Sequence, residues 1–123
     1  MFEEADIISR YTRADALRDG TLVDVTDTAR EAGIRFPTAL TRAVWGRFVE
    51  VPPGVEAQDE AGRLWDVVWM LRLALAGAAG DTARYRLYVR NDNRRPKPVS
   101  LKAVCGPGDE GQPVITVMLP DDD

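Results

Sequence analysis

Basic side chains around one tyrosine are the feature of this sequence with the clearest chemical potential. They lie in one predicted hairpin, residues 84–102, and comprise Arg84, Arg86, Tyr88, Arg90, Arg94, Arg95, Lys97 and Lys102. Such a pattern can follow a nucleic-acid backbone while the aromatic ring stacks on a base. It is also typical of a solvated strand face or a protein contact, and the net charge of −4 favours these interpretations over a dedicated nucleic-acid binder.

Residues that could support catalysis are few. The chain has no histidine, which excludes a histidine base, a histidine-containing triad and a histidine metal ligand. The only cysteine, Cys105, is expected to face the core as an unreactive thiol, because thiol reactivity requires an exposed electropositive setting. Carboxylates could still converge on a site, although nothing in their spacing requires it. We therefore expect a non-enzymatic protein with no catalytic residues, no metal site and no cofactor.

The segment Gly106–Gly111 is rich in glycine and invites a comparison with phosphate-binding loops. It lacks the lysine and the following helix that a P-loop uses, and its two acids would repel phosphate. A connection between two strands is the favoured interpretation, since glycine accepts the backbone angles of turns. The acidic tip, Asp109 and Glu110, is predicted as a contact loop for a partner.

Composition indicates one soluble domain of 123 residues. A single cysteine excludes an internal disulfide, and the acidic N-terminus does not resemble a signal peptide, so we expect a cytoplasmic protein without a membrane partner. Basic residues gather in 61–105, whereas 1–60 and 106–123 are acidic. This asymmetry fits a charged partner or internal pairing equally well, and the oligomeric state stays open. Residues 1–10 are expected to be mobile, and 120–123 to form an acidic tail.

A central helix is predicted to position the basic hairpin. From Asp59 to Gly80 the apolar residues follow helical spacing, and Leu64, Val68, Leu71 and Leu75 form a stripe that Trp65, Trp69 and Val67 widen. Asp59, Arg63 and Asp66 fall on the opposite, polar face. The width of the apolar arc predicts a helix covered on most sides.

The predicted fold class is α+β, a C-terminal three-stranded antiparallel meander packed on this helix. Short helices precede it, with one additional short strand among them. The meander follows from alternating apolar residues in the strands 84–90 and 97–105. The third strand, 113–119, is apolar on both faces, which predicts a central or covered position. The N-terminal half predicts helices at 13–19, 28–32 and from Phe36 to Phe48, and a strand at 21–25.

Several segments resemble a small uncharacterised bacterial family, a domain of unknown function. They include Gly-Arg-Leu-Trp-Asp-Val-Val-Trp-Met at 62–70 and Cys-Gly-Pro-Gly-Asp-Glu-Gly at 105–111. Further similarity covers 11–17, 19–25, 29–33, 36–41 and 113–120. Such proteins occur among accessory genes of plasmids, phages and integrated elements, and the family brings no catalytic residues. Together with the absence of catalytic chemistry and the segregated charge, the resemblance favours a non-enzymatic protein-binding accessory protein that modulates a host defence or replication partner. The alternative is nucleic-acid binding through hairpin 84–102.

Overall fold

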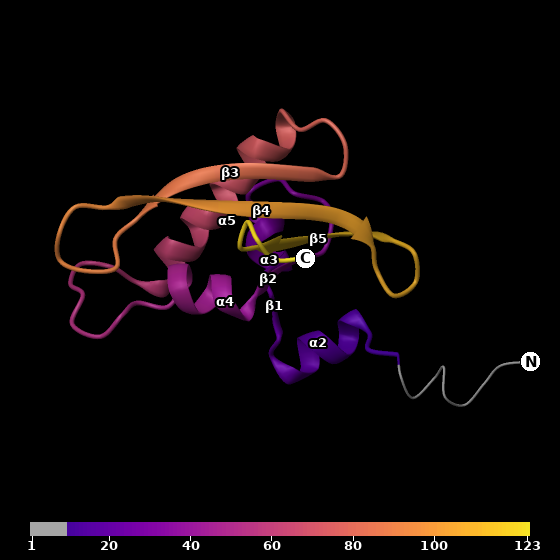
Figure 1. The fold of residues 1–123 in the computed structure, drawn as a ribbon, viewed down its shortest axis with the longest axis horizontal. Coiled ribbons are helices and arrows are strands. Elements are labelled where there is room, and N and C mark those ends of the chain that lie inside the picture. The colour runs from indigo at the N-terminus through magenta and orange to yellow at the C-terminus, as the bar shows by residue number, and fades with distance from the viewer. Residues whose placement is uncertain (1–9) are drawn as a thin grey trace, which may run out of the picture.

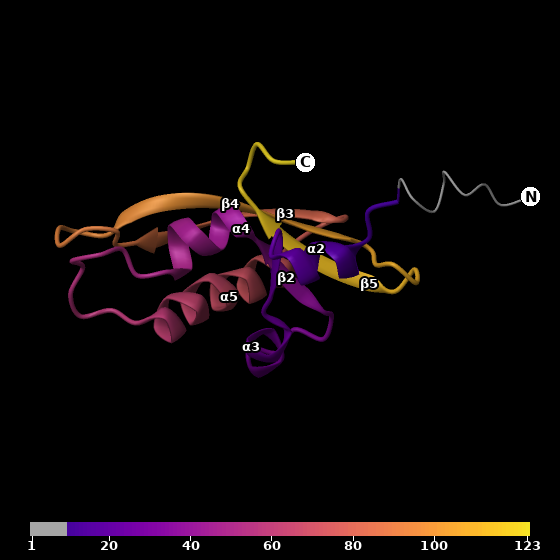
Figure 2. The same cartoon turned by 90° about the horizontal axis from the view of Figure 1, so that it is seen from below.

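The computed structural model describes residues 10–123, so the mobility expected for 1–10 falls almost entirely outside the described residues. A five-stranded mixed sheet forms the centre of the fold, with strand order β1-β2-β5-β4-β3. The strands are β1 Leu22–Asp24, β2 Thr38–Thr41, β3 Thr82–Val89, β4 Lys97–Pro107 and β5 Pro113–Met118. The helices are α2 Arg13–Asp19, α3 Thr26–Glu31, α4 Arg42–Val44, the π-helix η1 Trp45–Val49, and α5 Glu60–Ala76. Figures 1 and 2 show α3 and α5 together on one side of the sheet.

The predicted C-terminal meander is confirmed as one part of this sheet. Strands β3, β4 and β5 pair antiparallel in chain order, and Tyr85 of β3 lies opposite Leu101 of β4. Along β3 the side chains alternate strictly between exposed and buried, as the sequence pattern predicts. The sheet nevertheless continues beyond the meander, because β2 pairs parallel with β5 and β1 pairs antiparallel with β2.

The helix predicted from Phe36 to Phe48 is wrong in its first part. Thr38–Thr41 forms β2, and the helix begins only at Arg42, where the Thr41 hydroxyl accepts a hydrogen bond from the Val44 N–H at 3.3 Å. Most of β2 is buried because it lies between two other strands, which removes the alternation that usually marks a strand. Tertiary contacts of β2 thus override the helical spacing of the apolar residues in this short segment.

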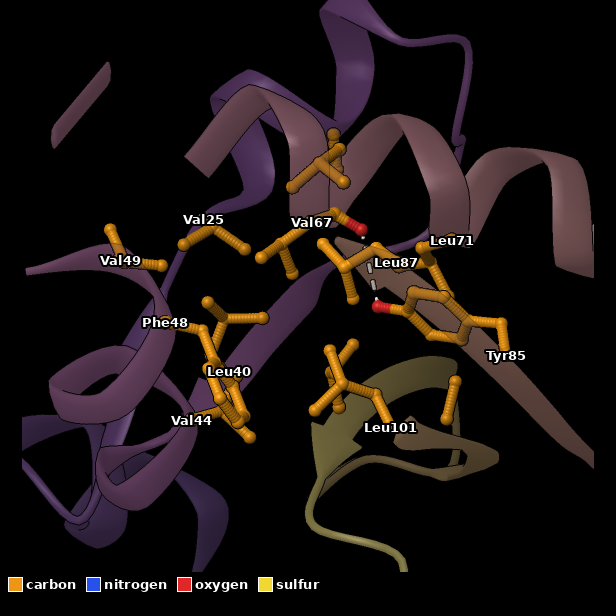
Figure 3. Close-up of a cluster of buried hydrophobic side chains, with 14 of the residues drawn as sticks. Val25, Leu40, Val44, Phe48, Val49, Val67, Leu71, Tyr85, Leu87 and Leu101 are labelled. Atoms are coloured by element: carbon orange, nitrogen blue, oxygen red, sulfur yellow. Dashed lines mark hydrogen bonds between the residues drawn. The ribbon is translucent and has the colours of Figure 1, made fainter. Parts of the chain in front are cut away.

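The core lies between the sheet and α5 (Figure 3). Val67, Val68 and Leu71 of α5 are fully buried against Leu40, Leu101 and other sheet residues. The Tyr85 hydroxyl donates a hydrogen bond to the Val67 carbonyl at 3.1 Å, and burial raises the pKa of that tyrosine. Cys105 is partly buried against the same cluster. The central helix is therefore confirmed, with Asp59 as its N-cap.

Two expectations for the faces of α5 are wrong. Arg63, expected on the polar face, is only 6% exposed, because the end of η1 and the β3–β4 turn close over it. Trp65 and Trp69, expected to extend a covered arc, remain 37% and 42% exposed. The sheet ends at β3, so no element in residues 10–123 covers this flank of the helix.

Candidate functional site

A groove runs between α5 and the outer strand β3. Its larger part has a volume of about 720 Å³ and its smaller part about 440 Å³, and both parts are lined by Asp66, Leu87 and Tyr88. We call this surface the α5–β3 groove. The remaining lining residues on its walls are Phe48, Ala57, Gln58, Asp59, Gly62, Arg63, Trp65, Trp69, Met70, Arg86, Val89, Arg90, Pro96 and Pro98.

Two tryptophans form the apolar wall of the groove on α5. Trp65 and Trp69 are four residues apart, so they project from the same side of the helix. Their ring centroids are 5.9 Å apart and their planes differ by 13°, a stacked arrangement. Stacking holds each ring in place while much of its surface still faces solvent. The wall is thus an apolar surface made of two stacked rings.

Arg63 anchors the end of the groove near the β3–β4 turn. Its guanidinium donates hydrogen bonds at 2.7–3.4 Å to five acceptors, namely the carbonyls of Val49, Arg47 and Arg90 and the side chains of Gln58 and Asn91. Burial lowers the pKa of this arginine, the nearby charge of Arg90 lowers it further, and Asp66 opposes the shift. The fork of five donors ties four segments of chain together around one side chain.

The sequence-predicted basic residues divide into two groups in the structure. Arg84, Arg86 and Tyr88 lie on the exposed face of β3, and Tyr88 is 71% exposed. Arg94, Arg95 and Lys97 are exposed around the β3–β4 turn. Neither of the two ion pairs found in residues 10–123 involves these side chains. The strand and the turn therefore both present unpaired positive charge.

Arg90 differs from the other predicted basic residues. It donates to the Asp92 carbonyl at 3.0 Å and to the Asn93 amide oxygen at 3.2 Å, and it also reaches the Glu56 carbonyl. These contacts hold the turn against the loop before α5. Arg90 thus shapes the groove, and less of its charge is available to a partner.

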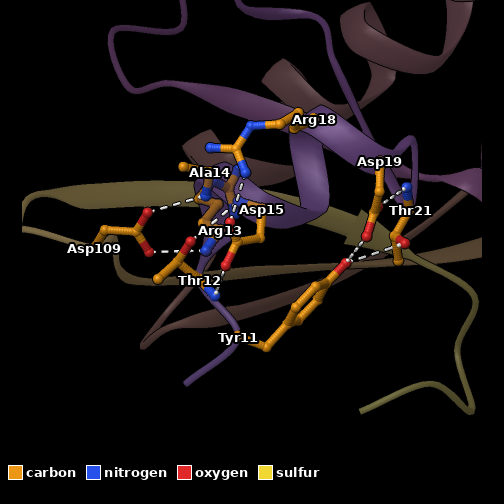
Figure 4. A network of polar contacts seen from close by, with 9 residues as sticks. All are labelled: Tyr11, Thr12, Arg13, Ala14, Asp15, Arg18, Asp19, Thr21 and Asp109. Atoms are coloured by element: carbon orange, nitrogen blue, oxygen red, sulfur yellow. Dashed lines mark hydrogen bonds and ion pairs between the residues drawn. The ribbon is translucent and has the colours of Figure 1, made fainter. Parts of the chain in front are cut away.

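Asp109 of the predicted acidic loop is used inside the chain. Its carboxylate accepts hydrogen bonds from the N–H groups of Arg13 at 2.8 Å and Ala14 at 3.0 Å, at the start of α2 (Figure 4). These bonds, with the one from Ala14 the stronger influence, lower the pKa of Asp109. Glu110 is exposed beside it. The acidic contact loop stays a prediction, with Glu110 the freer of its two side chains.

Acid is expected to loosen α2 from the sheet. Asp109 and Asp15 both have lowered pKa values, the latter because the Thr12 N–H and then the Arg18 side chain bond to it. A lowered pKa contributes stability above the unfolded value of about 3.9 and loses it as the pH falls through the folded value. Titration from pH 6 to 2.5 should therefore shift the NMR amide signals of Arg13 and Ala14.

The matched variant for this titration is Asp109→Asn, which keeps the shape of the side chain and removes its charge. It should shift the Arg13 and Ala14 signals at neutral pH and flatten their response to acid. Amide signals that stay constant down to pH 2.5 in the unmodified protein would contradict the role given to this carboxylate.

The pair Trp65 and Trp69 and the buried Arg63 were not identified as site residues from the sequence. The spacing of the tryptophans was visible there, but their exposure depends on where the sheet ends. The burial of Arg63 depends on two segments far away in the sequence, the end of η1 and the β3–β4 turn, and no local signal indicates it. Among residues 10–123, no cluster of three potential metal-binding side chains occurs, and no helix is long and apolar enough to cross a membrane.

Comparisons with known proteins identify a family and no individual relative. No curated protein and no solved structure matches the chain. One family model matches residues 1–123, and its description is a family of unknown function, DUF6573. Because that match covers the whole sequence, the chain belongs to the DUF6573 family.

Proposed function

We propose that this protein is a non-enzymatic protein-binding module that serves as an accessory protein of a mobile genetic element and modulates a host defence or replication partner. The observation that carries the binding role is the α5–β3 groove, where Trp65, Trp69 and Tyr88 are exposed beside unpaired arginines. Tryptophan, tyrosine and arginine are the residues that most often dominate the energy of protein interfaces. The mobile-element context is supported by the resemblance described above.

Affinity capture of the tagged protein from a bacterial host, with and without nuclease, tests this role. A stoichiometric protein partner should survive nuclease treatment and be lost from a Trp65→Ala, Trp69→Ala double variant. Leu73→Ala is the matched control, because Leu73 is 49% exposed on the same helix and does not line the groove. Equal capture by the double variant, or no protein partner at all, would contradict the proposal.

Nucleic-acid binding through the hairpin is the second candidate function. It is favoured by the exposed row of Arg84, Arg86 and Tyr88, which places two positive charges and one ring on a single strand face. Binding to DNA or RNA should then weaken steeply with salt. It should also be lost when Arg94, Arg95 and Lys97 are all replaced by alanine. Binding of fluorescent oligonucleotides at several salt concentrations measures this, and an absence of salt-dependent binding would remove the candidate.

A further inference from the structure

Strand β3 is an open edge of the sheet along its whole length. It pairs with β4 on one side, and no strand of residues 10–123 pairs with it on the other. The strand is eight residues long, whereas β1 at the opposite edge has three. Natural proteins usually shorten or cover such edges, because unpaired backbone groups are a template for another strand.

The backbone groups at this free edge can be assigned from the register. The Cys105 N–H donates to the Asp81 carbonyl at 2.7 Å, so this antiparallel pair is a hydrogen-bonded one. Alternation along β3 then directs the backbone N–H and C=O groups of the odd-numbered residues toward β4. The N–H and C=O groups of Thr82, Arg84, Arg86 and Tyr88 consequently point outward, where they are available to solvent or to a partner strand.

The surroundings of the edge define what could pair with it. A strand added beside β3 lies about 4.8 Å away and projects its side chains alternately to the two faces of the sheet. On one face they would enter the α5–β3 groove, next to Trp69 and Met70. On the other, exposed face they would lie next to Arg84 and Arg86, which lack carboxylate partners among residues 10–123. The Arg86 side chain also borders the groove.

We infer that the free edge of β3 binds an extended peptide segment in which apolar residues alternate with acidic ones, by adding it to the sheet as a sixth strand. This inference rests on the proposed protein-binding function and specifies its ligand. Backbone hydrogen bonds to the edge supply affinity, and the groove and the arginines select the side chains. Asp66 in the groove disfavours an acid on the apolar side, which fixes the order of the alternation.

A second copy of this chain fits the edge less well. Pairing two β3 edges about a twofold axis would set the arginines of one copy against those of the other. Like charges opposite each other in a sheet are destabilising. An acidic segment is instead attracted by the arginines of β3, so charge complementarity favours the peptide as the occupant.

Synthetic ten-residue peptides that alternate glutamate with valine, leucine, phenylalanine or tryptophan are the probes for this site. At least one should bind the full chain in fluorescence anisotropy, and replacing every glutamate with lysine should weaken it at least about tenfold. On binding, the Arg84, Arg86 and Tyr88 amides should become protected from hydrogen exchange. Binding without that protection, or no binding by any of the four peptides, would overturn the inference.

Arg86→Pro and Arg86→Ala form a matched pair at the centre of the edge. Proline is tolerated on an edge strand where the N–H faces solvent, and it removes the outward donor; alanine removes only the side chain. Arg86→Pro should weaken the best peptide at least about tenfold, and Arg86→Ala should weaken it clearly less. Equal losses would assign binding to charge alone and overturn strand addition. If Arg86→Pro does not fold, the exchange measurement on the unmodified protein decides.

Failure of this inference is distinguishable from failure of the proposed function. A host protein that is captured by the unmodified chain and equally by Arg86→Pro, but not by the Trp65→Ala, Trp69→Ala variant, would retain the binding module and exclude the edge. Exchange protection of the edge amides in the free protein that rises with its concentration would assign the edge to a second copy and overturn the peptide as its occupant.

Discussion

Replacing Arg63 with alanine is expected to lower the free energy of unfolding by about 3 kcal/mol, because each buried acceptor left without a donor costs roughly 1–3 kcal/mol. Arg63 is 6% exposed, and three of its five acceptors are backbone carbonyls, two in η1 and one in Arg90, directly after β3. Water can replace some of these bonds, which keeps the expected loss below the sum of the separate penalties. Urea unfolding followed by tryptophan fluorescence measures the change.

Two controls separate the guanidinium from the charge. Arg63→Lys keeps the positive charge but has no planar fork, so it should recover only part of the lost stability. Arg35→Ala removes an exposed arginine from a loop and should change the free energy of unfolding by no more than about 0.5 kcal/mol. A loss at Arg63 as small as that at Arg35 would show that the carbonyls find other donors and that the arginine does not hold these segments.

The Arg63 prediction also bears on the groove. The Arg63 side chain bonds to Gln58 before α5 and to Asn91 after β3. It therefore holds the two walls of the larger part of the α5–β3 groove at a fixed separation. Arg63→Ala should therefore weaken peptide binding beyond the effect of Arg63→Lys. Binding is to be compared at a temperature where both variants are folded, so that stability and recognition are not confused.

Local chemistry explains which elements could be predicted from the sequence. Thr12 and Asp15 form a capping box at the start of the predicted helix 13–19, and Gly20 ends that helix with a φ of 86°. Asp59 caps α5 through the Gly62 N–H at 2.6 Å. The alternation along β3 is equally local. Each of these signals depends on residues within one turn or one strand, and the two helices and the strand that they mark were predicted correctly.

The candidate site could be predicted only in part, because its geometry is tertiary. The basic row Arg84, Arg86 and Tyr88 was visible as a sequence pattern. The position of β3 at the edge of the sheet was not visible. It depends on β2, which pairs with β5 and so extends the sheet on the side of the meander away from β3. A helical wheel likewise describes one helix in isolation, so it could not show that Arg63 would be covered or that Trp65 and Trp69 would remain open.

Replacing Leu101 with alanine is expected to cost about 2–5 kcal/mol, the range for a large-to-small change that leaves a cavity in a core. Leu101 is fully buried on β4, between β3 and β5, and lies opposite Tyr85 in the ladder. The strands on both sides restrict how far the backbone can move to fill the space. The loss should therefore fall in the upper half of the range.

Val99→Ala is the matched control for Leu101→Ala, because Val99 lies on the same strand and the same face but is only half-buried. Its expected loss is about 1 kcal/mol, typical of a partly exposed apolar contact. Urea unfolding of both variants measures the difference, and equal losses would mean that strand propensity, not burial at position 101, sets the cost. Hydrogen exchange of Leu101→Ala also tests the position of β3 at the sheet edge. Because β4 is the only strand that pairs with β3 in residues 10–123, a destabilised β4 should raise hydrogen exchange along β3 before the whole sheet unfolds.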